Sequence, residues 1–256
     1  MVKTRDVARL AAGSPACQEM DMISVIIPAH NAEHRLAATL AALVPSAIDG
    51  IVKQVIVVDA GSTDSTAEVA DQAGADVVNS APGRGGQLAL GAALARFPWL
   101  LFLNADTVLE DGWERSATAF MRRVDRGERP MAAGAFTFRL DDKGVAPRLL
   151  ERLVHLRCKI LRVPYGDQGL LIPRQLFDAV GGYKNLPIME DIDLARRLGR
   201  RRLAMLDAYA TTSAERYKRD GYLSRSLRNQ ICQVLYGAGL PMSVVARLHG
   251  SVETAP

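Results

Sequence analysis

From Ile23 onward, the chain alternates short apolar runs with longer amphipathic stretches. We interpret the apolar runs as β-strands and the amphipathic stretches, whose apolar residues recur at helical spacing, as α-helices. In chain order we expect a strand at 23–28, a helix at 32–43, a strand at 55–59, a helix at 63–73 with Ser62 as its N-cap, a short strand at 75–79, a glycine-rich turn at 82–86, a helix ending at 96, a strand at 99–103 and a helix at 111–126. Because each strand is followed by a helix, the connections are right-handed crossovers and the strands are parallel. The sequence therefore predicts an α/β fold.

The second half of the chain is less regular. Residues 131–140 alternate like a strand, a basic helix follows, and 169–173 form a further short strand. Beyond residue 213, apolar residues recur at helical spacing between Leu223 and Leu235. We expect a poorly ordered leader at 1–21, one α/β domain at 22–213 and a helical C-terminal segment at 214–256.

The composition excludes several classes of protein. With 256 residues, of which 48% are hydrophobic, the chain is long enough for one sizeable core. A net charge of +4 is too small to indicate a nucleic-acid partner. The three cysteines, Cys17, Cys158 and Cys232, lack the spacing of a zinc site or a disulfide framework, and no apolar run approaches the roughly 18 to 20 residues of a membrane-spanning helix. We expect a cytoplasmic protein.

Two acidic positions stand at the ends of predicted strands. Asp59 ends the strand at 55–59, and Asn104-Ala105-Asp106 follows the strand at 99–103. In open parallel sheets, ligands bind outside the carboxyl ends of the strands. Taken singly, each carboxylate is equally explained as a helix N-cap or as a charge at the solvent end of its strand.

Three motifs taken together are more specific. The segments 24–31 (SVIIPAHN), 57–64 (VVDAGSTD) and 103–107 (LNADT) occur in this order, and the chain from Ile23 to about Arg216 resembles the family two glycosyltransferases of the GT-A fold, a Rossmann-like, mixed and mainly parallel sheet. The resemblance implies that a nucleotide-diphosphate sugar, first of all a UDP-sugar, is the donor. It implies that Pro28, Ala29 and Asn31 lie under the base and ribose, that Asp59 accepts a hydrogen bond from the uracil or ribose, and that Asp64 supports the same loop.

The resemblance also implies a divalent metal. Asp106 would coordinate Mg²⁺ or Mn²⁺ against the diphosphate, as a hard cation with one protein carboxylate and substrate phosphates requires. The family commonly has Asp at both ends of this motif, whereas this chain has Asn104 at the first position, which offers an oxygen without a charge. In the segment 82–87 (PGRGGQ), Arg84 provides a fixed positive charge suited to a diphosphate. We interpret the glycines around it as a plain loop rather than as a phosphate cradle, because related proteins continue there with Asn before Gly.

A second acidic cluster, Glu190-Asp191, resembles the family's Glu-Asp motif. By position, Asp191 would be the base that deprotonates the acceptor hydroxyl, and Glu190 would orient the acceptor or the base. Direct displacement of this kind inverts the anomeric centre. Acids in a first helical turn also arise simply as partners of the helix dipole.

The loop 165–169 (YGDQG) resembles that of a bacterial subgroup associated with radical-SAM and selenodomain proteins. Asp167 and Gln168 would bind hydroxyls of the acceptor or the sugar, and Tyr183 would lie near the donor sugar. A polar turn between a helix and a strand has a similar sequence.

Two other functions fit parts of the pattern. A sugar-phosphate nucleotidyltransferase also uses a Rossmann-like sheet and a metal-binding Asp, but the residues after the first strand, 28–31 (PAHN), lack the glycine-rich signature of that class. A catalytically inactive, membrane-associated GT-A scaffold would fit Asn104, although Asp59, Asp106 and Asp191 are intact.

The C-terminal segment predicts a peripheral contact with an anionic membrane on the inner face of the cell membrane. Basic residues flank its apolar stripe, as in an interfacial amphipathic helix: Arg216, Lys218, Arg219, Arg225 and Arg228. The alternative is that the stripe packs on the catalytic domain and that Arg216 points inward to the diphosphate.

Overall fold

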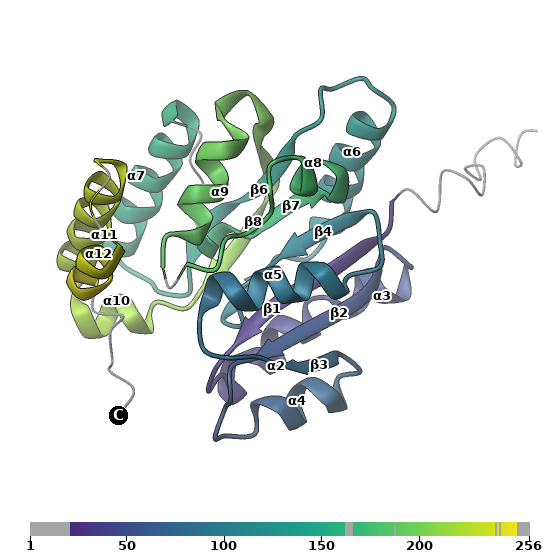
Figure 1. The fold of residues 1–256 in the computed structure, drawn as a ribbon, viewed down its shortest axis with the longest axis horizontal. Helices are drawn as coiled ribbons and strands as arrows, with labels where there is room; N and C mark the ends of the chain where they lie inside the picture. The colour runs from purple at the N-terminus through teal and green to yellow at the C-terminus, as the bar shows by residue number, and fades with distance from the viewer. Residues whose placement is uncertain (1–20, 162–165, 187, 239, 241, 250–256) are drawn as a thin grey trace, which may run out of the picture.

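The computed structural model describes residues 21–161, 166–186, 188–238, 240 and 242–249. An eight-stranded sheet, ordered β3-β2-β1-β4-β7-β6-β8-β5, forms its centre (Figure 1). The strands are β1 Ile23–Ala29, β2 Val52–Asp59, β3 Asp76–Asn79, β4 Trp99–Phe102, β5 Thr107–Leu109, β6 Ala133–Leu140, β7 Leu170–Pro173 and β8 Leu203–Thr212. Of the expected leader at 1–21, residues 1–20 lie outside the described residues and Asp21 is described.

The sheet is mixed and mainly parallel, which confirms the predicted fold class. Strand β1 pairs in parallel with β2 and β4, β2 with β3, and β6 with β8. Strand β7 runs antiparallel between β4 and β6, and β5 runs antiparallel to β8. The carboxyl ends of β1, β2 and β4 therefore meet at one edge of the sheet.

Helices cover both faces of the sheet because successive residues of a strand point to opposite sides. In β1, Val25 and Ile27 belong to a core with α2 Glu33–Ala41, α4 Thr66–Gln72 and α6 Trp113–Asp125. The intervening Ile26 belongs to a second core with α5 Arg84–Leu94, α8 Arg174–Ala179 and α9 Glu190–Leu198. Figure 1 shows α5 in front of the sheet and α2 behind it, with the short α3 Val44–Ile48 beside α2. Trp99 and Trp113 are buried, as core residues.

Two local predictions are wrong, and two strands were not predicted. Ser62 is not the N-cap of the next helix, because α4 begins after Ser65 and the Ser62 hydroxyl binds Asp59 instead. The glycine-rich turn is helical from Arg84 onward, since α5 starts there. Strands β5 and β8 had no predicted counterpart: β5 is three residues long, and β8 carries small alanines at several of its inward positions.

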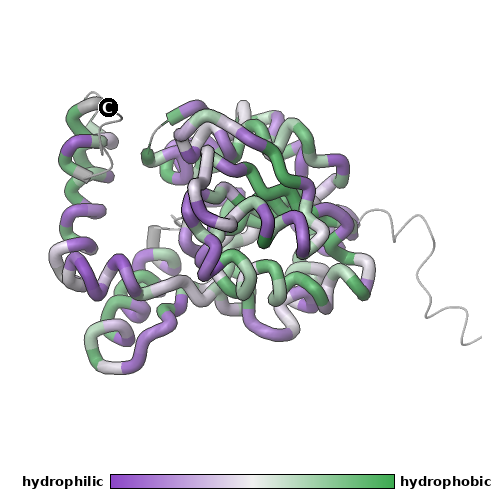
Figure 2. Tube along the Cα trace, turned by 90° about the horizontal axis from the view of Figure 1, so that it is seen from below, coloured by the Kyte–Doolittle hydropathy of each residue, from purple (hydrophilic) through white to green (hydrophobic). Residues whose placement is uncertain are grey.

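The remaining helices form a layer at one side of the sheet. They are α7 Val145–Leu161, α10 Glu215–Asp220, α11 Tyr222–Gly237 and α12 Met242–His249, with short 3-10 turns at Gly166–Gln168 and Arg200–Arg202. Apolar residues of α11 and α12, among them Cys232 and Val245, pack against Ile188 and Ile192 around the start of α9. Figure 2 shows the C-terminal helices standing beside the main body, with hydrophilic and hydrophobic residues mixed along them.

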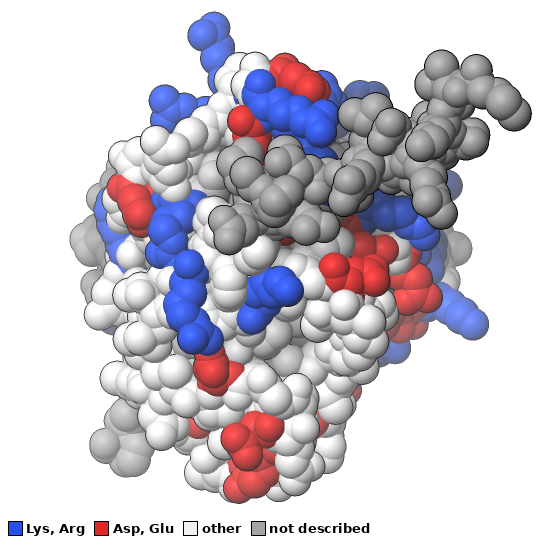
Figure 3. Space-filling view, turned by 90° about the vertical axis from the view of Figure 1, so that its right-hand side faces the viewer, with Lys and Arg blue, Asp and Glu red and all other residues white. Residues whose placement is uncertain are grey.

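Figure 3 shows the side of the molecule that lies opposite the C-terminal helices. There, acidic and basic side chains lie among uncharged ones, without a broad area of one sign. In the described part of the chain, no helix is both long enough and apolar enough to cross a membrane.

Candidate active site

A cavity of about 350 Å³ opens at the carboxyl ends of β1 and β4. Most of the residues predicted to bind the nucleotide and the metal lie on its wall: Pro28, Ala29, Asn31, Arg84, Asn104, Asp106 and Arg216. Ala29 ends β1 and Asn104 lies two residues after β4, so adjacent parallel strands deliver these groups to one place. The structure thus brings together residues that are up to 188 positions apart in the chain, from Pro28 to Arg216.

The two remaining predicted donor residues, Asp59 and Asp64, build the loops around this cavity. Asp59 is 3% exposed, and its carboxylate accepts hydrogen bonds from the backbone N–H groups of Gly61 and Ser62 at 3.2 and 2.9 Å. Asp64 accepts from the backbone N–H of Glu33 at 3.2 Å, which ties the loop after β2 to the start of α2. Desolvation opposes ionisation of Asp64, but hydrogen bonds from the Thr66 hydroxyl and from the backbone N–H groups of Glu33, Thr66 and Asp64 itself hold its pKa below the ordinary value.

Asn31 also links the loop after β1 to the loop after β2. Its backbone N–H donates to the Ser62 hydroxyl at 2.9 Å, and its side-chain oxygen accepts from the backbone N–H of Thr63 at 2.9 Å. Asn31 has φ = 47°, a left-handed conformation that Asn tolerates better than most residues. The loop that would face the base is therefore held rigid by its own hydrogen bonds.

Asn104 and Asp106 have different environments. The Asn104 side chain is buried, accepts a hydrogen bond from the Arg84 guanidinium, and donates from Nδ2 to Asp167 Oδ1 at 3.0 Å. Burial, followed by the neighbouring carboxylate of Asp167, raises the pKa of Asp106 above its ordinary value, while Arg216 opposes that rise. Asp106 is thus a partly desolvated carboxylate that has one carboxylate, Asp167, and two guanidinium groups, Arg216 and Arg84, near it.

Arg84 forms an ion pair with Glu190 at the base of the cavity. Arg84 Nε lies 2.5 Å from Glu190 Oε1, and the Glu190 side chain is 4% exposed. Burial raises the pKa of Glu190, and Arg84 opposes this shift. Burial by itself would lower the pKa of Arg84, but the surrounding carboxylates, Glu190 foremost, raise it, so the guanidinium stays charged. Sequence reasoning identified both residues separately but did not pair them.

The start of α9 presents the predicted acid and base. Met189, just before the helix, has φ = 63°, a strained conformation for a residue with a side chain. This turn places Glu190 and Asp191 in the first helical turn, where Asp191 Oδ1 accepts from the backbone N–H of Ile192 at 2.8 Å. Asp191 is half-buried and close enough to Arg84 to contribute to its raised pKa, but it does not line the nucleotide-side cavity.

The predicted acceptor-side residues divide into two groups. Asp167 and Gln168 line a second cavity. Gln168 is buried, and its side-chain amide donates to the carbonyl of Phe136 at 2.9 Å. Tyr183 packs in an aromatic cluster, with its ring centroid 4.8 Å from that of Phe102. Burial and the carboxylates of α9 raise the pKa of the Tyr183 phenol, so it remains a hydrogen-bond donor. Tyr165, in the same predicted loop, lies outside the described residues.

The basic residues of the C-terminal segment are largely engaged within the protein. Asp220 lies 2.8 Å from the guanidinium groups of both Arg225 and Arg228, and 3.0 Å from that of Arg219. Lys218 pairs with Asp142 at 3.2 Å. Arg216 instead lies on the wall of the nucleotide-side cavity, as the alternative to membrane contact expects.

The chemistry of the cavity fits a divalent cation shared with a diphosphate. Among the described residues, no group of three or more His, Cys, Asp or Glu side chains is arranged to hold a metal by itself. A cation bound through one carboxylate and substrate phosphates does not need such a group. The cavity wall carries two carboxylates, Asp106 and Glu215. Glu215 pairs with Arg35, so Asp106, whose pKa is raised, is the candidate ligand.

Sequence reasoning missed several residues of the cavity wall. Gln87 is buried, and its amide donates to the carbonyls of Ala29 and Val58 at 3.0 and 2.7 Å, which joins α5 to the ends of β1 and β2. Arg35 pairs with Asp141 at 3.1 Å and with Glu215, across the rim of the cavity. Gln87 had a signal, since it is a polar residue on the apolar face of its helix, whereas Arg35 had none.

Gly85 makes a contact beside the Arg84–Glu190 pair that a side chain would disrupt. A Cβ at Gly85 would lie 2.2 Å from the carbonyl oxygen of Lys184 and 2.7 Å from the backbone nitrogen of Leu186. We expect Gly85→Ala to lower the free energy of unfolding by about 1–3 kcal/mol, the usual cost of overpacking. Gly86→Ala is the matched control, because its Cβ would meet only the side chain of the exposed Asn185. Urea unfolding of both variants checks this, and equal stabilities would contradict it.

Comparisons with known proteins agree with this geometry. No curated protein sequence matches the chain. Among solved structures, glucosyl-3-phosphoglycerate synthase from Mycobacterium tuberculosis, in complex with Mn²⁺, UDP and glucosyl-3-phosphoglycerate, is 23% identical with a TM-score of 0.57, covering 88% of this chain and 83% of that one. Residues 1–349 of TarS from S. aureus are 17% identical with a TM-score of 0.56, covering 90% of this chain and 70% of that one. At these identities the likeness shows a shared fold.

The family model described as glycosyl transferase family 2 matches residues 24–184, more than half of the chain, and the protein therefore belongs to glycosyl transferase family 2.

Proposed function

We propose that this protein is a metal-dependent, inverting glycosyltransferase that moves a sugar from a nucleotide-diphosphate sugar, first of all a UDP-sugar, to a hydroxyl acceptor. The observation that carries the proposal is the cavity at the ends of β1 and β4. It brings a desolvated carboxylate, Asp106, close to two guanidinium groups, Arg84 and Arg216, beside a loop held by hydrogen bonds of Asp59 and Asn31. A nucleotide diphosphate needs this combination of a shaped loop, a metal-binding carboxylate and positive charge.

The residues of the cavity have distinct roles in this proposal. Pro28 and Ala29 form the floor for the base, and Arg84 and Arg216 face the diphosphate. A divalent cation, Mg²⁺ or Mn²⁺, held by Asp106 would stabilise the negative charge that develops on the leaving diphosphate. Because Arg84 is itself held by Glu190, its position does not depend on the ligand. Asn104 hydrogen-bonds both Arg84 and Asp167 and so orients them.

Asp191 acts as the base in this proposal. A carboxylate that takes the proton from the acceptor hydroxyl activates its oxygen for attack opposite the leaving diphosphate. Glu190 keeps Arg84 in place and, with Asp191, keeps the Tyr183 phenol protonated. In this proposal Asp167 and Gln168 would bind the acceptor, and Tyr183 would lie near the donor sugar.

Known structures support the choice of nucleotide and metal. The mycobacterial synthase was solved with UDP and Mn²⁺, and also with UDP-glucose, Mn²⁺ and phosphoglyceric acid. The proposal also includes a cytoplasmic location. It further places the protein in the bacterial subgroup associated with radical-SAM and selenodomain proteins, because the loop around Asp167 resembles that of the subgroup.

Two measurements test the function. Calorimetry with UDP, with and without Mn²⁺, is expected to show metal-dependent binding; an inactive scaffold would show none. Incubation with a panel of UDP-, GDP- and TDP-sugars is expected to release free nucleoside diphosphate. Release of pyrophosphate from a nucleoside triphosphate plus a sugar phosphate would instead identify a nucleotidyltransferase.

Peripheral membrane contact is a separate prediction. The exposed side chains of Leu227, Ile231 and Val234 on α11 support it, whereas the ion pairs of Arg225 and Arg228 with Asp220 reduce the free positive charge. We expect co-sedimentation with anionic vesicles at low salt and release at high salt, because each basic residue contributes only about 1 kcal/mol. If the protein stays in the supernatant with anionic vesicles at low salt, there is no such contact.

A further inference from the structure

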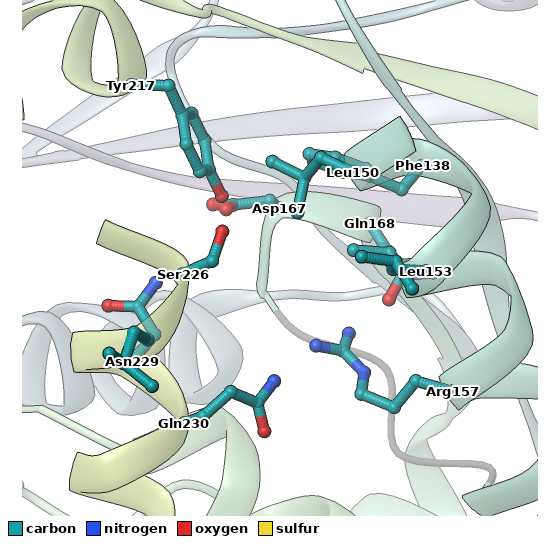
Figure 4. Close-up of a pocket in the computed structure, with 12 residues that line it drawn as sticks. Phe138, Leu150, Leu153, Arg157, Asp167, Gln168, Tyr217, Ser226, Asn229 and Gln230 are labelled. Atoms are coloured by element: carbon teal, nitrogen blue, oxygen red, sulfur yellow. The ribbon is translucent and has the colours of Figure 1, made fainter. Parts of the chain in front are cut away.

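A second cavity, of about 430 Å³, lies between α7, α11 and strand β6, apart from the nucleotide-side cavity. Its volume falls within the range of small-molecule sites, about 300–1,000 Å³. Figure 4 shows α7 and α11 as its opposite walls, with Asp167 and Tyr217 at one end.

The walls of this cavity combine an apolar surface with a polar end. Apolar side chains come from α7, β6 and α11: Leu150, Leu153, Val154, Phe138 and Leu227. At the polar end, the hydroxyl groups of Tyr217 and Ser226 point toward the Asp167 carboxylate (Figure 4). A molecule that fills this space would bury an apolar part and turn a hydroxyl toward Asp167.

The charges on the walls favour an uncharged molecule. Among the described lining residues, Arg157 is the one cation and Asp167 the one carboxylate, so the cavity has no excess of positive charge. A phosphorylated or polyanionic acceptor would need several donors or cations, as phosphate sites usually provide. Hydroxyl groups need only single hydrogen-bond partners, such as the Asp167 carboxylate and the Ser226 hydroxyl on the cavity wall.

One hydrogen bond connects the two cavities. Asn104 lines the nucleotide-side cavity and donates to Asp167, which lines the second cavity, at 3.0 Å. Asp167 also influences the pKa of Asp106, so the two carboxylates are close neighbours. A hydroxyl at Asp167 therefore lies next to the region where the diphosphate and its sugar would bind.

We propose that this second cavity is the acceptor site and that the acceptor is an uncharged, amphipathic molecule, with an apolar body against α7 and a hydroxyl group at Asp167. This inference rests on the proposed glycosyltransferase function and adds the chemical class of the acceptor.

The first test measures binding with two probes that differ only in an apolar group. Phenyl β-D-glucoside and glucose are titrated against the protein by ligand-observed NMR in the absence of donor. We expect phenyl glucoside to bind at least about tenfold more tightly, from burial of its ring. Leu153→Gln should remove most of this preference. Leu156→Gln is the matched control, because it lies on the same helix, is similarly exposed (52% against 54%) and does not line the cavity.

The second test locates the probe relative to the donor site. With UDP present, paramagnetic Mn²⁺ should broaden the signals of phenyl glucoside more than diamagnetic Mg²⁺ does, and Leu153→Gln should abolish the difference. Equal binding of the two probes, unchanged binding in Leu153→Gln, or no Mn²⁺ effect on a bound probe would each overturn the acceptor assignment. A failure of UDP to bind with Mn²⁺, measured on the same sample by calorimetry, would instead refute the proposed function. The two failures are therefore distinguishable.

Discussion

Asp106→Asn is expected to reduce Mn²⁺-stimulated sugar transfer by at least about a hundredfold, in the range seen when one electrostatic partner of a developing charge is lost. Two carboxylates lie on the wall of the nucleotide-side cavity, and Glu215 pairs with Arg35, so Asp106 is the candidate metal ligand. Asn104 cannot replace it because an amide carries no negative charge. Asn has the same shape as Asp but no charge, so the variant removes the charge and leaves the cavity intact. Asp106→Ala should lose as much activity.

The measurement is nucleoside diphosphate release as a function of Mn²⁺ concentration. Asp207→Asn is a suitable control, since Asp207 is an exposed residue of β8 that does not line the nucleotide-side cavity. The fold should be unaffected in all three variants, which thermal unfolding would show. If Asp106→Asn retained most of its Mn²⁺-dependent rate, Asp106 would not be the metal ligand.

The parts of the fold that carry local signals could be predicted from the sequence. Strands β1, β2 and β4 are nearly unbroken apolar runs, because both of their faces are buried, and such runs stand out in any sequence. The polar residues that follow them, such as Asp59 and Asp106, could therefore be placed at one edge of the sheet. Their arrival around one cavity follows from the parallel topology.

Strand β8 could not be predicted because its pattern is weak. Three of its inward positions are Leu206, Ala208 and Ala210, and alanine is also a common helix residue. Without β8, the position of Arg216 at the cavity could not be predicted either. Pairing of β8 with β5 brings the residues after Thr212 beside Asp106, whose carbonyl accepts from the backbone N–H of Ser213 at 3.3 Å, and so delivers Arg216 to the cavity.

The contacts between distant side chains were also beyond the sequence. The Arg84–Glu190 ion pair and the Asn104–Asp167 hydrogen bond join residues 106 and 63 positions apart, and no periodicity reports such pairs. The cavity between α7 and α11 depends on how two helices are placed in space, which their individual patterns do not determine. Each helix by itself shows only an amphipathic face.

The second large effect is expected at Asp191. Asp191→Asn should lower turnover by about 10²- to 10⁴-fold, the range for loss of a general base, while the affinity for UDP with Mn²⁺ changes little. We expect turnover to fall without a loss of UDP affinity because Asp191 lies in the first turn of α9 and not on the wall of the nucleotide-side cavity. The carboxamide retains an oxygen that can accept from the Ile192 backbone N–H, but it cannot take a proton from a hydroxyl.

Glu190→Gln is the informative comparison for Asp191→Asn. Glu190 is nearly fully buried and paired with Arg84, so its loss should lower the midpoint of thermal unfolding and weaken UDP binding by releasing Arg84. Asp191→Asn should affect both less, because the Asp191 side chain is only half-buried, whereas the Glu190 carboxylate is the one that lies 2.5 Å from Arg84 Nε. Turnover, UDP affinity and thermal midpoint, measured for both variants, therefore separate a base from a structural carboxylate. If Asp191→Asn lost UDP affinity and turnover by the same factor, Asp191 would be a structural residue and the proton would have to leave by another group.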